Sequence, residues 1–167
     1  MKFKNESGRS MIEMLGVLAI IGVLSIGGIA GYTLSMRRYR ANNVLDAAAK
    51  YSLIAYGNCQ QTLLNGQISA LENCNAATYA PTYANAGVGD LPAGASDIQF
   101  VSMISMGGST GSDATLVTVT FTGSDAQRLC QAALSTTGTK VPFEGGPIQN
   151  VCADEDDPKL DVIIRQN

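Results

Sequence analysis

The chain contains no histidine among its 167 residues, and this absence excludes several classes of enzyme. The segment from Gly107 to Gly111 has the pattern Gly-x-Ser-x-Gly of serine hydrolases, but that mechanism needs a histidine base. Histidine-ligated metal sites and histidine acid–base catalysis are excluded for the same reason. We therefore interpret the segment as a glycine-serine turn and predict a non-enzymatic protein with no metal or cofactor.

Charged residues are also scarce, at 15% of the chain, and the formal net charge is −3. This balance argues against a general nucleic-acid binder, because affinity for phosphates comes from basic side chains. One dense acidic run, Asp154 to Asp157, offers carboxylates of the kind that calcium prefers. The run lacks the spacing of a calcium-binding loop, so we interpret it as a solvated turn.

No charged residue occurs from Met14 to Leu34. As a helix these residues reach about 30 Å, which matches the hydrocarbon thickness of a bilayer. A secretory signal has a shorter apolar run that ends in a cleavage site, whereas here the convincing processing site, Gly8, precedes the run. Cleavage at Gly8 would leave the apolar segment on the mature protein. We therefore predict a membrane-spanning segment of about residues 11–34.

Proline is absent until Pro81, so nothing in the sequence stops the helix at the end of the apolar run. We predict one helix from about Ser10 to Tyr56, with Gly57 as its C-terminal stop. The second half carries an apolar stripe that we expect to pack on a sheet, formed by Met36, Tyr39, Val44, Ala47, Tyr51 and Ile54.

One carboxylate, Glu13, lies at the start of the apolar stretch, five residues after Gly8. A charge in the hydrocarbon region costs about 2.5 to 3.5 kcal/mol, so an acid at this position implies a partner. An α-amino group exposed by cleavage after Gly8 on a neighbouring copy of the chain would be such a partner. Glu13 therefore points to association between copies.

The short charged leader, Gly8, Glu13 and the apolar run together resemble the class III signal of type IV pilins and of type II secretion pseudopilins. The resemblance implies cleavage after Gly8 by a prepilin peptidase and N-methylation of the new first residue. That residue is Arg9, where the family usually has an apolar side chain. The resemblance also implies a homo-polymer whose subunits leave the bacterial inner membrane through an assembly platform and ATPase.

Glycines divide the apolar run, and two of them, Gly27 and Gly31, form a Gly-x-x-x-Gly pair that lets two helices approach closely. Frequent glycine is also an ordinary property of membrane helices, so both interpretations stand. In the family that the chain resembles, a glycine at the place of Gly22 begins a segment whose helix loosens in the assembled fibre. The family's usual downstream proline is absent here.

Four cysteines, Cys59, Cys74, Cys130 and Cys152, are an even number and contain no Cys-x-x-Cys pair. In a chain whose body is exported, they are expected to form disulfides. Three connectivities are possible. We favour Cys59 with Cys74 and Cys130 with Cys152, because each pairing closes a local loop.

The pattern after the long helix predicts an α+β head with a small antiparallel sheet. Strands are expected at residues 98–105, 115–122 and 160–164, an exposed loop at 79–94, and a helix at 124–134 with Ser124 as its cap. This order looks like the head of type IVb pilins, in which a disulfide-bounded region corresponds to the loop from Cys130 to Cys152. The expected domains are a leader (1–8), the long helix (9–56) and the disulfide-bonded head (57–167).

Three arginines, Arg37, Arg38 and Arg40, follow the apolar run. Such residues usually lie among lipid headgroups or pair with acids of a neighbour, and DNA capture is the minority interpretation. The sequence therefore favours a type IV pilus subunit, held in the inner membrane with a periplasmic head before assembly and in an extracellular fibre afterwards. The alternatives are a type II secretion pseudopilin and a membrane-anchored periplasmic binding module.

Overall fold

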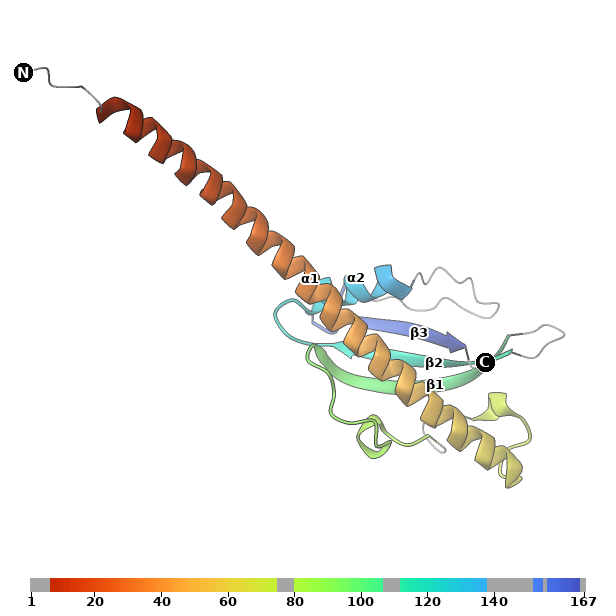
Figure 1. Ribbon diagram of the computed structural model, residues 1–167. Coiled ribbons are helices and arrows are strands. Elements are labelled where there is room, and N and C mark those ends of the chain that lie inside the picture. The colour runs from red at the N-terminus through yellow and green to blue at the C-terminus, as the bar shows by residue number, and fades with distance from the viewer. Residues whose placement is uncertain (1–6, 75–79, 107–111, 138–151, 155, 166–167) are drawn as a thin grey trace, which may run out of the picture. The chain divides into compact units, whose positions relative to one another are not determined.

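The computed structural model describes residues 7–74, 80–106, 112–137, 152–154 and 156–165 (Figure 1). It contains a long N-terminal helix, α1 (Ser7–Leu64), followed by a three-stranded antiparallel sheet and a second helix, which confirms the expected α+β class. The glycine-serine segment at 107–111 lies outside the described residues. So does most of the loop between Cys130 and Cys152.

The chain divides into two compact units, Met1–Met36 and Arg37–Asn167, which we call the N-terminal unit and the head unit. The first consists of the early turns of α1, and the second contains the rest of α1 with every strand. All of the buried apolar residues that the structure describes lie between Ala41 and Val162, within the head unit. The head unit therefore has a hydrophobic core of its own.

The sequence predicted that the long helix ends at Tyr56. In the structure, helix α1 continues through Gly57 to Leu64. A glycine inside a helix costs only about 1 kcal/mol, and burial of Ala55, Cys59 and Thr62 along one face offsets it. The helix ends instead at Gly66, which has a φ of 71°. The Gly66 N–H donates to the Leu63 carbonyl and the Gln67 N–H to the Thr62 carbonyl, the hydrogen-bond pattern of a Schellman cap.

The sheet has the strand order β1-β2-β3, formed by β1 (Ala95–Met106), β2 (Ser112–Phe121) and β3 (Lys159–Arg165). Both pairings are antiparallel, and they place Val117 of β2 opposite Phe100 of β1 and Val162 of β3. The predicted hairpin and the predicted last strand are therefore confirmed, with somewhat longer strands.

The face of α1 that packs on the sheet differs in part from the predicted stripe. Val44 and Tyr51 are buried as expected, but Tyr39 is 61% exposed, and Met36, Ala47 and Ile54 are only half-buried. The core positions of α1 recur at steps of three and four residues and are mostly small: Ala41, Val44, Ala48, Tyr51, Ala55 and Cys59. Alanine at alternate core positions lets the helix backbone approach the sheet closely.

Two disulfides join neighbouring elements of the head unit, Cys59–Cys74 and Cys130–Cys152. This is the sequential pairing that the sequence favoured. The first links the last turns of α1 to the residue after the short 3-10 helix η1 (Leu71–Asn73). The second links helix α2 (Ala126–Thr137) to the turn before β3. In chain-entropy terms, each contributes about 3 kcal/mol to stability.

Helix α2 (Ala126–Thr137) begins two residues later than predicted. Ser124 is therefore not its cap, and the Ala126 N–H donates instead to the carbonyl of Gly123. Gly123 has a φ of 104°, so the turn into α2 is made by glycine backbone geometry rather than by a capping hydroxyl. The predicted loop contains one further short 3-10 helix, η2 (Tyr83–Asn85).

Gly94 precedes strand β1, and its substitution tests whether the turn at this position requires glycine. It has a φ of 104°, and a Cβ at this position would overlap the side chain of buried Leu129 of α2. Gly94→Ala should therefore lower the free energy of unfolding through both backbone strain and overpacking, by roughly 2 to 5 kcal/mol in sum. Urea denaturation of the purified protein measures the effect.

Gly89→Ala is the matched control for this prediction. Gly89 has a similar φ of 110°, but no atom lies within 4 Å of an added Cβ. Its substitution should cost only the backbone strain, about 1 to 2 kcal/mol. Equal losses in the two variants would show that contact with Leu129 does not constrain the turn.

Candidate functional site

The first candidate site is the exposed apolar surface of the N-terminal unit. Every described side chain from Met11 to Leu34 is exposed, and Ile12 and Ile26 each keep 73% of their surface. The most apolar window of α1 has a mean hydropathy of 2.2, and none of it is buried within the chain. Length and composition suit this helix to crossing a membrane, which indicates membrane anchoring.

Two hydroxyl groups inside the apolar segment are satisfied within the helix. Ser25 Oγ donates to the Ile21 carbonyl at 2.7 Å, and Thr33 Oγ1 donates to the Ala30 carbonyl at 2.9 Å. Such bonds remove the cost of placing a hydroxyl in an apolar environment. Glu13 is exposed as these two residues are, but it has no ion pair with any described residue.

The helix period places Glu13, Gly16, Gly27 and Gly31 on one face of the N-terminal unit and Gly22 on the opposite face. A Cβ added at any of these glycines would have no atom of the chain within 4 Å. The fold of a single copy therefore does not require glycine at these positions. The sequence had identified Glu13 and the glycine pair, but only the helix places them together on one face.

The predicted processing residues, Gly8 and Arg9, lie in the first turn of α1, which begins at Ser7. Only their backbone is described, so cleavage after Gly8 stays a prediction.

The three arginines after the apolar run have different surroundings. The Arg37 Nε lies 3.7 Å from Asp125 Oδ2, and both side chains are about one-third exposed. A pair so accessible to water contributes at most about 1 kcal/mol. Arg38 and Arg40 are exposed and make no ion pair with the described part of the chain.

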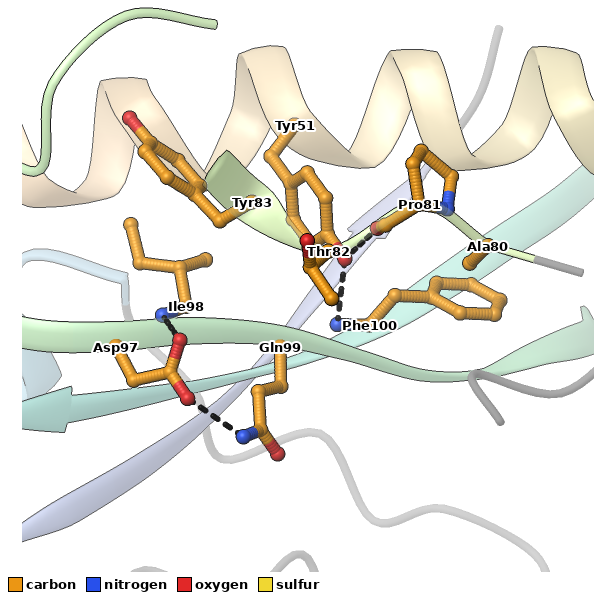
Figure 2. Close-up of a pocket in the computed structure, with 9 residues that line it drawn as sticks. All are labelled: Tyr51, Ala80, Pro81, Thr82, Tyr83, Asp97, Ile98, Gln99 and Phe100. Carbon is orange, nitrogen blue, oxygen red and sulfur yellow. Dashed lines mark hydrogen bonds between the residues drawn. The ribbon is translucent and has the colours of Figure 1, made fainter. Parts of the chain in front are cut away.

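A second candidate site is a cavity of about 290 Å³ in the head unit, between α1, strand β1 and residues 80–83 (Figure 2). Its inner wall is formed by buried Tyr51, Tyr83 and Phe100, and the rings of the two tyrosines are 5.6 Å apart. Half-buried Asp97 and exposed Gln99 lie on the outer side. The cavity therefore combines an aromatic interior with a carboxylate at its edge.

The hydroxyl of Tyr51 connects the elements that form this cavity (Figure 2). It donates to the Pro81 carbonyl at 2.7 Å and accepts from the Phe100 N–H at 3.4 Å. Phe100 belongs to β1, an edge strand of the described sheet, and lies next to an irregularity in the pairing with β2, so Tyr51 supplies an acceptor for a backbone donor at this point. Burial raises the pKa of Tyr51, the Phe100 N–H opposes this, and the charge of Asp97 adds to the rise.

Asp154 and Asp157, at the two ends of the acidic run, are engaged in local contacts. Asp154 Oδ1 accepts from the N–H groups of Asp156 and Asp157, and Asp157 pairs with Lys159 at 2.5 Å. Within the described residues, no three Cys, Asp or Glu side chains are grouped as metal ligands. Glu155 lies outside those residues.

Comparison of the chain with family models, with curated proteins and with solved structures gives no match. The long apolar helix followed by a small antiparallel sheet is compatible with a pilin-like fold.

Tyr51→Phe tests the role of the Tyr51 hydroxyl. The variant leaves the Pro81 carbonyl and the Phe100 N–H without this partner, so at pH 7 it should be less stable by about 1 to 3 kcal/mol. The pKa of Tyr51 is higher in the fold than the ordinary value of 10, so its hydroxyl stabilises the protein fully below pH 10. This contribution to stability is lost as the pH rises above 10, because Tyr51 ionises at a lower pH in the unfolded chain than in the folded protein.

The stability gap between the native protein and Tyr51→Phe should therefore narrow from pH 9 to pH 11, as measured by denaturation at each pH. Tyr39→Phe is the control, because Tyr39 is exposed, and it should change stability by less than about 0.5 kcal/mol at either pH. A stability difference between the native protein and Tyr51→Phe that stays constant with pH would contradict the stabilising role of the buried Tyr51 hydroxyl.

Proposed function

We propose that the chain is a structural subunit of a type IV pilus that polymerises through its N-terminal helix after cleavage at Gly8. The observation that carries this proposal is an apolar helix exposed on all sides, with one carboxylate, Glu13, at its start. Burying a large aliphatic side chain contributes about 1.5 to 3 kcal/mol. Helices of neighbouring copies can replace lipid as the apolar surroundings of this segment.

Glu13 explains why association between copies is favoured over permanent residence in lipid. Cleavage after Gly8 creates an α-amino group at Arg9, and this cation needs a partner in an apolar environment. Glu13 of an adjacent copy neutralises it, so two charges that are each costly in isolation are removed together. Gly16, Gly27 and Gly31 on the same face allow the backbones to approach closely.

The two disulfides support an exported head, because such bonds persist in oxidising compartments. Before assembly the chain is held in the bacterial inner membrane with its head in the periplasm. A prepilin peptidase, an assembly platform and an ATPase then bring it into an extracellular fibre. In this function the protein is not an enzyme, and it needs no cofactor or nucleic acid.

Mass spectrometry of the N-terminus in sheared surface filaments tests the proposal. We expect a mature chain that begins at Arg9, with or without a methyl group on its amine. An intact Met1, found only in membranes without filaments, would contradict it and favour a membrane-anchored binding module. Loss of protein secretion without surface fibres in a deletion strain would favour the pseudopilin alternative.

Glu13→Gln tests the proposed charge pair. The amide keeps the size of the side chain but cannot neutralise an ammonium group, and an unpaired buried charge costs about 3 to 5 kcal/mol. Filament yield should therefore fall on the order of 100-fold or more, while the amount of protein in the membrane stays the same. Immunoblots of sheared and membrane fractions measure both.

Glu72→Gln removes the same charge from an exposed position in η1 and is the matched control. It should leave filament yield unchanged. A normal yield from Glu13→Gln would show that the carboxylate has no part in assembly.

A further inference from the structure

The head unit has an acidic surface centred on Tyr83. The 290 Å³ cavity that this ring lines has Asp97 at its edge, and a second hollow of about 300 Å³ that it also lines contains Asp46 and Asp90. Lys50 lines the second hollow, whereas none of the described basic residues lines the first. A cation that entered the first cavity would meet the aromatic wall of Tyr51, Tyr83 and Phe100, which attracts positive charge through the faces of its rings.

The same unit carries two exposed arginines that lack an acidic partner within the described chain and that project from α1 roughly 160° apart. Arg38 and Arg40, which we call the collar, are exposed, whereas Arg37 is already paired with Asp125. The collar cannot reach the cavity of its own copy. Arg40 and Tyr51 are eleven residues apart on α1, which is about 16 Å along the helix axis and more than an arginine side chain spans.

We propose that the collar of one copy binds the Tyr51–Tyr83–Phe100 cavity of a second copy, with a guanidinium group beside Asp97. The ligand of the cavity is thus an arginine side chain of the same protein. This inference rests on the proposed function, because it requires copies that are displaced along the axis of α1. It identifies a contact between heads that is separate from the Glu13 pair between N-terminal helices.

The charge and chemistry of the two surfaces support this pairing. Asp97 is half-buried, so its field is screened less than that of a fully exposed acid. Arginine combines a permanent charge with a flat group that stacks on aromatic rings, which suits a cavity with both features. Lipid phosphates could occupy the collar before assembly, but they would be repelled by the acidic surface of the cavity.

The contact is heterologous, because the collar and the cavity are different surfaces of one molecule. Each copy offers both surfaces, so the contact can repeat from copy to copy along a filament and does not produce a symmetric dimer. One such pair is weak in water, but a filament repeats it at every subunit.

The test uses filaments of the full chain with two cysteines placed beside the proposed contact. Tyr39→Cys lies between the two collar arginines in the sequence and Gln99→Cys lies at the cavity, and both native side chains are exposed. All four native cysteines are in disulfides, so only the new thiols can react on mild oxidation. A non-reducing gel should show a ladder of dimers, trimers and longer species, whereas each single-cysteine variant should give dimers at most.

Charge reversal gives the second part of the test. In the double-cysteine background, Arg38→Glu with Arg40→Glu should reduce the ladder by about five-fold or more, because like charges then meet at the cavity. Adding Asp97→Lys should restore the ladder at least in part. Arg128→Glu reverses an exposed arginine of α2 outside the collar and should leave the ladder unchanged.

Failure of this inference can be told from failure of the proposed function. Filaments that contain the chain but give no ladder, or a ladder that collar reversal does not affect, overturn the contact and leave the fibre role in place. Absence of the chain from every filament overturns the fibre role, and the contact with it.

Discussion

The structure depends on an apolar helical surface that the chain cannot cover by itself. From Met11 to Leu34 the side chains of α1 are exposed, and the head unit has a complete core without them. Water is an unfavourable environment for such a surface, so lipid or other copies must surround it. In the function that we propose, Glu13 favours copies over lipid, since a carboxylate in an apolar setting needs a cation that lipid tails do not provide.

Helix α1 is one element of secondary structure with two kinds of surface. In the N-terminal unit it is apolar on all sides, as expected of a helix that lies in an apolar environment. In the head unit its apolar positions narrow to one face of small residues, of which Ala41, Ala48 and Ala55 are fully buried. The change of pattern near Arg37 marks the boundary between the two units.

The head unit is held together by a small number of specific links. Two disulfides fix the ends of α1 and α2 to the segments that follow them. Tyr51 fixes α1 to the edge strand β1 and to Pro81 through one hydroxyl group. That hydroxyl also shapes the aromatic cavity, so the same residue contributes to stability and to the surface that we propose as a contact between heads.

The sequence by itself determined the features that depend on local pattern. The uncharged run after Glu13, the missing prolines and the alternating strands were enough to predict the long helix, the hairpin and the α+β class, because hydrophobic period and turn chemistry act over short distances. Local loops were also enough to favour the correct disulfide pairing. The absence of histidine excluded a serine hydrolase on composition alone, since that mechanism needs a histidine base.

Only the tertiary structure decided the features that depend on residues far apart in the chain. In the local sequence Gly57 favours the end of a helix. Burial of Ala55, Cys59 and Thr62 nevertheless stabilises the continuation of α1 beyond it. Tyr39 was predicted to belong to the apolar stripe, but the face of α1 that the sheet covers is that of Ala41 and Val44, which lies nearly opposite Tyr39 and leaves it exposed. The Arg37–Asp125 pair and the Tyr51 cavity join segments separated by dozens of residues, and no short-range pattern specifies which of them meet.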